Sequence, residues 1–523
     1  MKRCNCFVRS LLAICLLAAC LAPAAVAEVT LPAVFSDHMV LQHGVPLPVW
    51  GWADAGEKVA VSIAGQSKEA TAGGDGSWSL RLDPIEAGGP YEMLVRGQNT
   101  LKISDVLVGE VWLCSGQSNM AMTVRGVENA DAEIAAAQFP RIRMLTVQRA
   151  SAVEPQRQIE GTWQVASPET AAAFSATAYF FGRELHEALG VPVGLVNSSW
   201  GGTAVEAWTN VNVQKTVSDI APVLELSNEA IRGYDAEQVT ARYEKQMAAW
   251  KEAAAAARAA KKSVPKPPRK PEDPRMSQNR PGNLYNGMIA PLIPYAIRGA
   301  IWYQGERNSR DELSKLYGVQ LQTLIGNWRD EWGQGDFPFL YVQLPNFMAP
   351  QQEPSENAGW VFVREGMLQT LSLANTGMAI TTDIGDANNI HPKNKQEVGR
   401  RLALSALAGT YGRDVAGSGP IYRSMRPDRG KIVVEFDHVG GGLKTAGDGP
   451  LAGFAIAAGD RKFVWAEAVI DGDTVVVSSP KVKQPAAVRY SWAANPKGNL
   501  VNAAGLPASP FRTDDWDEPV IPR

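Results

Sequence analysis

Residues 111–120 read Val-Trp-Leu-Cys-Ser-Gly-Gln-Ser-Asn-Met. Residues 111–113 predict a buried strand, and Ser118 follows it closely. A serine just past a strand end stands at the edge of a sheet, where a nucleophile can meet a substrate carbonyl. The Gly-x-Ser-x-Gly elbow is excluded, because only Gly116 of its two glycines is present. A plain buried serine in a turn is the alternative interpretation of this stretch.

Short apolar runs and helical stretches alternate on either side of this segment. Residues 193–196 and 299–302 are such runs, and residues 178–189 have a helical pattern. This alternation predicts an α/β domain, residues 105–413, with a parallel sheet covered on both faces. The sites of such sheets lie at the carboxyl ends of the strands, so motifs that follow strands should converge there.

The two ends of the chain have the period-two pattern of β structure. Near the N-terminus, Val59, Val61 and Ile63 alternate with small residues, and residues 73–76 form a Gly-rich turn. Near the C-terminus, residues 432–434 and 475–477 are short β-branched apolar runs that are typical of strands. Asp471-Gly472 between them is a hairpin turn signal. We therefore expect β modules at residues 28–104 and 414–523.

An insertion at about residues 214–280 interrupts the α/β pattern. Residues 235–262 are rich in Ala, Glu, Lys and Arg, with Tyr243, Met247 and Trp250 on one helical face. The proline-rich residues 264–274 suit an extended spacer. A solvated helix with a linker is the simpler interpretation, and an arm that binds a partner or gates the substrate is the alternative.

The N-terminus predicts export to the periplasm or the outside of the cell. Basic residues precede an apolar run at residues 11–21, and Ala25-Val26-Ala27 suits a signal peptidase, so residues 1–27 are predicted to be a signal peptide. The alternative is a lipoprotein box that anchors Cys20. Cleavage after Ala27 leaves Cys114 as the one remaining cysteine of five, which excludes an internal disulfide.

Composition excludes several partners. The 523 residues carry a formal charge of −3 and are 45% hydrophobic and 20% charged. These values are ordinary for a soluble protein and give no electrostatic footprint for nucleic acid or an anionic membrane. No His or Cys cluster has metal-ligand spacing around Asp383 and Asp386, so neither a metal nor another cofactor is expected.

A nucleophilic serine needs a base, and the chain has five histidines. Two of them, His38 and His43, lie in the first β module, and His438 lies in the second. His186 lies in an amphipathic helix, where a surface imidazole is the simpler interpretation. His391 follows the apolar residues 378–380 in an irregular segment, so it is the predicted base.

Four ordered motifs resemble those of the sialate O-acetylesterases, a family of SGNH-type hydrolases. They are Gly-Gln-Ser-Asn-Met at 116–120, Asn-Ser-Ser-Trp-Gly-Gly-Thr at 197–203, Trp-Tyr-Gln-Gly-Glu-Arg-Asn at 302–308, and residues 383–395 around His391-Pro392. The likeness extends to residues 38–42 and 284–288 and covers nearly the whole mature chain except the Ala-rich insertion. It implies an SGNH three-layer α/β/α domain between the two β modules.

The resemblance also assigns roles. Ser118 would attack an acetyl carbonyl and His391 would accept its proton. Backbone N–H groups of Ser118, Gly201 and Gly202 and the side chain of Gln304 would form the oxyanion hole. Binding of the substrate would involve three polar side chains near the nucleophile and in the third motif: Gln117, Asn119 and Asn308.

The acid that orients the histidine departs from the family pattern. SGNH hydrolases usually place an aspartate three residues before the histidine, and Asn388 stands there, followed by Asn389. Glu306 is the preferred acid, Asp386 is the alternative, and an unassisted Ser-His pair is the third possibility. A structural salt bridge to an arginine such as Arg307 is the competing interpretation of Glu306.

These observations predict an exported serine esterase that removes O-acetyl groups from carbohydrates. The alternative is a glycan-binding protein on the same fold with impaired catalysis, motivated by Asn388, Asn389 and Arg307 and by fifteen tryptophans. An esterase for lipid acyl chains is the third hypothesis. The sequence leaves open which acetylated glycan is the substrate.

Overall fold

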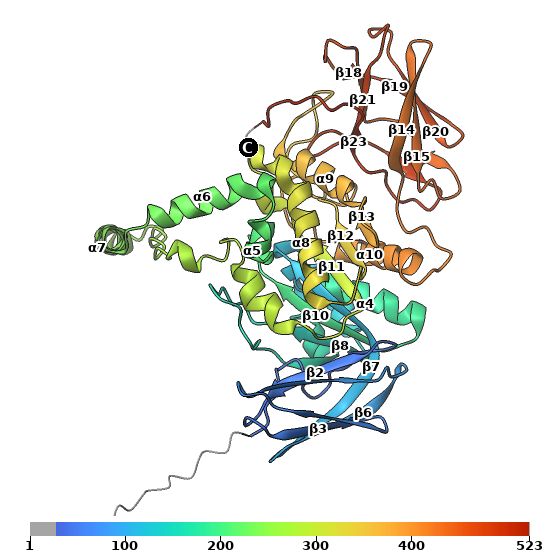
Figure 1. The fold of residues 1–523 in the computed structure, drawn as a ribbon. Coiled ribbons are helices and arrows are strands. Elements are labelled where there is room, and N and C mark those ends of the chain that lie inside the picture. The colour runs from blue at the N-terminus through green and yellow to red at the C-terminus, as the bar shows by residue number, and fades with distance from the viewer. Residues whose placement is uncertain (1–27, 522–523) are drawn as a thin grey trace, which may run out of the picture.

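The computed structural model describes residues 28–521. Figure 1 shows a central α/β domain with a β module at each end and a helical arm that projects from one side. The predicted leader and Cys20 lie outside the described residues. Within the described part of the chain, no helix is long and apolar enough to span a membrane, and no cluster of three or more metal-ligating side chains occurs.

The central sheet is built around one long strand, β7 (Thr100–Gly116). Its strand order is β13-β12-β11-β7-β10-β8-β9, and every pair is parallel except β8 with β9. The other strands are β8 (Phe139–Thr146), β9 (Trp163–Ala166), β10 (Val193–Ser199), β11 (Gly299–Tyr303), β12 (Phe339–Val342) and β13 (Thr376–Ala379). The carboxyl ends of the parallel strands therefore meet at one edge.

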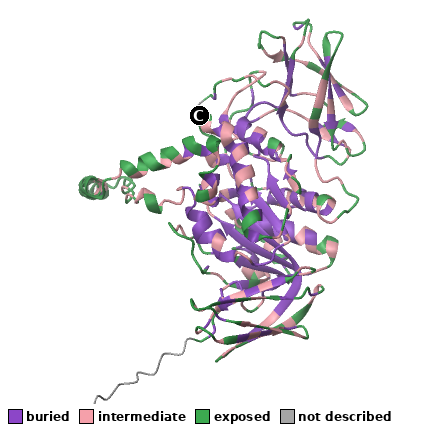
Figure 2. Cartoon of the chain, in the orientation of Figure 1, coloured by how far each residue is buried: buried purple, intermediate pink, exposed green. Residues whose placement is uncertain are grey.

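Helices cover both faces of this sheet, which confirms the three-layer α/β/α prediction. Successive residues of β7 point to opposite faces. Trp112 and Cys114 share a buried cluster with α4 (Ala176–Leu189) and α10 (Lys395–Gly409). Leu113 belongs to the cluster on the other face, with α8 (Tyr317–Trp332) and α9 (Gly359–Thr370). Figure 2 shows the resulting buried centre.

The N-terminal β module is joined to the central sheet by β7 itself. The first half of β7 pairs with β6, and its second half pairs with β10 and β11. The predicted boundary at residues 104/105 therefore falls inside a continuous strand. The module's other strands are β1 (Val40–Gln42), β2 (Leu47–Trp52), β3 (Lys58–Ile63), β4 (Gln66–Thr71), β5 (Ser77–Leu82) and β6 (Gly88–Arg96).

The C-terminal β module consists mainly of two four-stranded antiparallel sheets with a shared aromatic core that includes Phe436, Phe454 and Phe511. One sheet has the order β14-β15-β20-β19 and the other β18-β17-β21-β23. The strands are β14 (Ile421–Asp428), β15 (Lys431–Asp437), β16 (Leu443–Thr445), β17 (Phe454–Ala457), β18 (Val464–Trp465), β19 (Glu467–Asp471), β20 (Thr474–Ser478), β21 (Ala487–Tyr490), β22 (Leu500–Asn502) and β23 (Phe511–Arg512).

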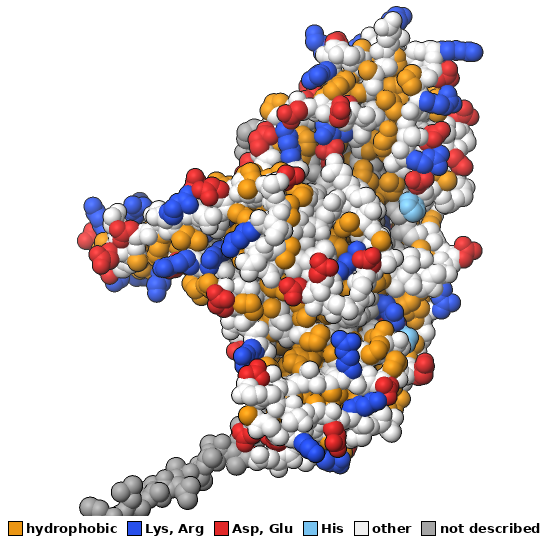
Figure 3. All heavy atoms as spheres, in the orientation of Figure 1, with side chains coloured by type: hydrophobic (Ala, Val, Ile, Leu, Met, Phe, Trp, Pro, Cys, Tyr) orange, Lys and Arg blue, Asp and Glu red, His pale blue; other side chains and the backbone are white. Residues whose placement is uncertain are grey.

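The insertion forms the projecting arm. Its helices are α6 (Ala221–Arg232) and α7 (Ala236–Ala259), and no helix or strand occupies residues 262–273. Most arm residues are exposed (Figure 2). One residue of the predicted stripe on α7 contacts the proline-rich segment, since Nε1 of Trp250 donates to the carbonyl of Pro265 at 2.8 Å. Figure 3 shows acidic and basic side chains interspersed over the face in view.

Candidate active site

Ser118 and His391 lie within hydrogen-bond distance. Ser118 begins α1 (Ser118–Ala121), directly after β7, and His391 lies in the segment between β13 and α10. The separation between Nε2 of His391 and Oγ of Ser118 is 2.8 Å. The structure thus brings together two side chains that are 273 residues apart, and it does so at the carboxyl edge of the sheet.

The turn before Ser118 requires a glycine. Gly116 has a φ of +137°, and a Cβ on it would lie 2.2 Å from the carbonyl oxygen of Tyr303. This close approach lets the backbone N–H of Gln117 donate to the same oxygen at 2.9 Å. The end of β11 therefore fixes the chain immediately before Ser118, the candidate nucleophile.

The glycine block after β10 packs directly on Ser118. The N–H of Trp200 donates to the carbonyl of Gly116 at 3.1 Å, and a Cβ on Gly201 would lie 3.3 Å from the Cβ of Ser118. The next glycine, Gly202, has a φ of +75°. Glycine at position 201 thus allows the main chain to approach the nucleophile, as an oxyanion hole requires.

Glu306 is buried beneath the nucleophile turn, with 3% of its surface exposed. Its two carboxylate oxygens accept from Nε2 of Gln117 at 2.6 Å and from Nδ2 of Asn119 at 2.5 Å. These donors belong to the residues on either side of Ser118. A single carboxylate from the end of β11 therefore fixes the residues on both sides of Ser118.

Lys395, the first residue of α10, is a candidate site residue that the sequence analysis did not identify. Its side chain is fully buried, and its Nζ donates to Oδ1 of Asn119 and to the carbonyl of Pro392, both at 2.7 Å. The available signal was its place in the fourth motif, four residues after His391. Burial of an ammonium group is costly unless it is hydrogen-bonded, so this placement indicates a specific role.

Burial and charge shift the pKa values of this site. Burial lowers the pKa of Lys395 to about 7, and the nearby charge of Glu306 opposes that shift. The pKa of His391 is also lowered, first by burial and then by the positive charge of Lys395. A lowered pKa keeps the imidazole neutral near pH 7, which is the form that accepts a proton.

Four of the expected oxyanion and substrate-binding side chains are instead bonded within the protein. Gln304 is fully buried, and its Nε2 donates to the carbonyl of Thr203 at 3.0 Å and to Oδ1 of Asn308 at 2.7 Å. Asn308 in turn donates to Glu206, while Gln117 and Asn119 donate to Glu306. These four side chains thus support the turn that carries Ser118 and the glycine block, and their roles toward the oxyanion and the substrate stay predictions.

The alternative acid, Asp386, is exposed and has a local structural partner. Its Oδ1 accepts from the backbone N–H of Asn388 at 2.8 Å. Asn389 shapes the same loop, because its Oδ1 accepts from the backbone N–H of His391 at 3.0 Å. These contacts organise the histidine loop and leave Glu306 as the buried carboxylate of the site.

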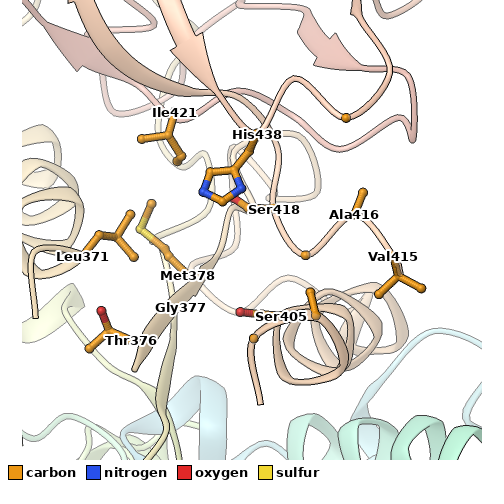
Figure 4. A pocket seen from close by; sticks show the side chains of 14 residues that line it. Leu371, Thr376, Gly377, Met378, Ser405, Val415, Ala416, Ser418, Ile421 and His438 are labelled. Carbon is orange, nitrogen blue, oxygen red and sulfur yellow. The ribbon is translucent and has the colours of Figure 1, made fainter. Parts of the chain in front are cut away.

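Two cavities lie near this part of the fold, and the first shares Glu206 with the network. One, of about 260 Å³, continues from the glycine block and is lined by Ala204, Glu206, Arg307 and residues of α6, so the arm forms one of its walls. The other, of about 480 Å³, lies between β13, α10 and the C-terminal module (Figure 4). His438 points into it, and none of the residues described above at the active site lines it.

Comparison with known proteins gives consistent results. Residues 108–255 and 275–408 match the model of the family described as carbohydrate esterase, sialic acid-specific acetylesterase. The chain is 31% identical to the sialate O-acetylesterase of Rattus norvegicus over 74% of its own length and 75% of the relative's, and 30% identical to that of Homo sapiens over 74% and 72%.

A solved structure extends the likeness to almost the whole chain. A carbohydrate acetylesterase from Xanthomonas citri superimposes with a TM-score of 0.79 at 38% identity, covering 94% of this chain and 100% of that one. The family match covers the strand ends that carry Ser118, Gly201, Glu306 and His391. The chain therefore belongs to the sialic acid-specific acetylesterase family of carbohydrate esterases, and it is a carboxylic ester hydrolase.

Proposed function

We propose that the protein is an exported serine esterase that removes O-acetyl groups from carbohydrates through a covalent acyl-enzyme. The observation that carries the proposal is the 2.8 Å contact between Nε2 of His391 and Oγ of Ser118. This distance is within the range for a nucleophile paired with its general base. The predicted leader at residues 1–27 supports export.

The geometry supports a two-step reaction. In the first step, Oγ of Ser118 attacks the acetyl carbonyl carbon while His391 takes the hydroxyl proton. The tetrahedral intermediate collapses, the sugar oxygen leaves, and His391 returns the proton to it. In the second step, His391 removes a proton from water as the water attacks the acetyl-serine, and it then gives that proton to Oγ of Ser118 as the ester bond breaks and acetate leaves.

Backbone N–H groups of Ser118, Gly201 and Gly202 are the proposed oxyanion donors. Hydrogen bonds hold two backbone carbonyls of the glycine block in place. Gln304 donates to the carbonyl of Thr203, and Gln278 donates to the carbonyl of Gly201. Main-chain donors fixed in this way need no reorganisation when charge develops on the carbonyl oxygen. Each such donor typically lowers the barrier by about 3 to 4 kcal/mol.

Glu306 is the proposed acid of the site. Burial supports this role, because a charge in a low-dielectric environment acts strongly on its neighbours. Its carboxylate also holds Gln117 and Asn119, so it both positions Ser118 and contributes the negative charge that favours the transient imidazolium. Lys395 is the proposed counter-charge that keeps His391 neutral in the resting enzyme.

An O-acetylated carbohydrate is the proposed substrate. The relatives named above are sialate and carbohydrate acetylesterases, which supports this substrate class. The cavity of about 260 Å³ beside the glycine block is the proposed site for part of the sugar, and its arginines, Arg280 and Arg307, offer hydrogen-bond donors there.

Replacement of Ser118 by alanine tests the proposal. The variant should hydrolyse p-nitrophenyl acetate and release acetate from acetylated glycans roughly 10³-fold more slowly or worse, with an unchanged melting temperature. Activity near the wild-type level in a folded variant would remove Ser118 as the nucleophile. Glycan binding without turnover in the wild-type protein would support the impaired-enzyme alternative instead.

A further inference from the structure

A wide groove lies between the N-terminal β module and the α/β domain, and the proposed chemistry does not use it. Its volume is about 710 Å³, within the usual range of about 300 to 1,000 Å³ for ligand sites. Strands β2 and β5 form one side. The end of β4 and the turn after it contribute Thr71, Gly73 and Asp75. Gln156, Arg157 and four of residues 290–294 complete the lining, and Ser118 and His391 are not among the lining residues.

Two tryptophans of β2 lie on the same side of the strand in this groove. Trp50 and Trp52 are two residues apart, so their side chains project from one face, and both are half-buried. On the neighbouring strand β5, Ser79 stands opposite Trp50 and Ser77 stands opposite Trp52. Because residues directly opposite each other share a face, small serines lie beside each indole and leave room for a ligand.

The ring of Trp50 and the main chain of Trp52 are each held by contacts within the N-terminal module. Trp50 packs edge-on against Phe35, with ring centroids 4.8 Å apart. The backbone of Trp52 is bonded to Thr30 on the side away from β5, with N–H to O distances of 2.8 and 3.0 Å. A strand and a ring that are already held in place lose little conformational entropy when a ligand binds.

Charges of both signs border the tryptophans. Asp75 and Arg157 both line the groove, and they come from segments that are distant in sequence. The pKa of Asp75 is lowered chiefly by the hydrogen bond from the hydroxyl of Ser77, and the positive charge of Arg157 adds to this effect. The groove thus offers a carboxylate acceptor and a guanidinium donor whose charges offset each other.

Aromatic faces flanked by hydrogen-bonding groups match the chemistry of a sugar ring. A pyranose has apolar C–H faces that can cover an indole, and hydroxyls that both donate and accept hydrogen bonds. We propose that this groove binds a stretch of neutral glycan chain, as an accessory site separate from Ser118. Since Asp75 and Arg157 together carry no net charge, an uncharged chain suits the groove better than an anionic one.

Binding measurements on the full chain test this proposal. Isothermal titration with cellohexaose and xylohexaose as neutral probes should show binding of at least one of them to the wild-type protein. Trp52→Ala should weaken that binding roughly tenfold or more, and Arg157→Ala should weaken it as well. Trp465→Ala, at a tryptophan that is 42% exposed in the C-terminal module, is the matched control and should change nothing.

Other measurements separate this proposal from the proposed catalysis. Ser118→Ala should bind the neutral probe like the wild type, and Trp52→Ala should keep the wild-type kcat/KM for p-nitrophenyl acetate. The accessory site is refuted if neither neutral probe binds, or if a folded Trp52→Ala and Arg157→Ala both bind as the wild type does. Equal or tighter binding of the anionic probe 3′-sialyllactose refutes the preference for a neutral chain.

Discussion

The ammonium group of Lys395 donates to Oδ1 of Asn119 at 2.7 Å, and Nδ2 of the same asparagine donates to the carboxylate of Glu306. One amide therefore links a buried cation to a buried anion. Such a chain of hydrogen bonds in a low-dielectric interior polarises each of its members. Because Asn119 adjoins Ser118, changes in either charge should reach the nucleophile.

Lys395→Met should shift the pH dependence of kcat/KM. The cation of Lys395 lowers the pKa of His391, so its removal should raise that pKa, and the acidic limb of the profile should move to higher pH. The pKa of Lys395 is about 7, which means that its charge is present where this limb lies. A pH-rate profile with p-nitrophenyl acetate measures the shift.

Lys393→Met is the matched control, because Lys393 is exposed and lies two residues away. Its profile should coincide with that of the wild type. An acidic limb of Lys395→Met that stays in place or moves to lower pH would contradict the proposed charge effect.

The two candidate acids should respond differently to neutralisation. Glu306→Gln replaces an acceptor oxygen with an NH2 group that must face the amide donor of Gln117 or Asn119, and it also removes the buried charge. We expect kcat to fall roughly 10²-fold or more. Asp386→Asn keeps an oxygen for the N–H of Asn388, so kcat should change less than about threefold. The opposite ranking would assign the acid to Asp386.

Gly201→Ala should slow the chemistry without unfolding the protein. The added Cβ would lie 3.3 Å from the Cβ of Ser118, which is a tight contact. Displacement of the nucleophile or of the oxyanion donors by a fraction of an ångström should lower kcat/KM roughly 10- to 100-fold. Kinetics with p-nitrophenyl acetate and a thermal melt check this together. Wild-type kinetics would mean that Gly201 does not border the reaction.

Gly326→Ala, in the helix α8, should raise the stability of the protein without changing its activity, in contrast to Gly201→Ala. A Cβ at this position meets no atom within 4 Å, and its φ is not in the left-handed region. Alanine in a helix interior is favoured over glycine by roughly 0.5 to 1 kcal/mol, so the free energy of unfolding should rise by that amount. Urea titration measures the change, and kcat should stay at the wild-type level. A lower stability would show that α8 tolerates no side chain there.

The spacing of apolar and polar residues predicted the elements that depend on neighbouring residues in the sequence. Period-two runs predicted β strands such as β3 and β20, and the serine after an apolar run predicted a nucleophile at a strand end. Of the stripe predicted on α7, Trp250 makes a hydrogen bond to Pro265. These features depend on neighbours within a few residues, which the sequence displays directly.

Contacts between distant segments were not predictable in the same way. Gln304 and Asn308 appear in a motif, yet only the fold reveals that their amides are bonded to Thr203 and Glu206. Lys395 looks like an ordinary lysine at the start of a helix until burial beside Asn119 is known. Polar residues alternate with apolar ones at residues 100–105 and give way to an apolar run, which predicted a boundary there but not that one strand runs across it.

The shared strand β7 has a consequence for how the protein can be divided. Its first residues are held by β6, while its last residues position Ser118. A chain cut at residue 105 would begin inside the central strand of the catalytic sheet and would lose the partner that anchors that strand's start. The N-terminal module and the α/β domain should therefore melt in one cooperative transition, and mechanical or thermal damage to the module should inactivate the distant nucleophile.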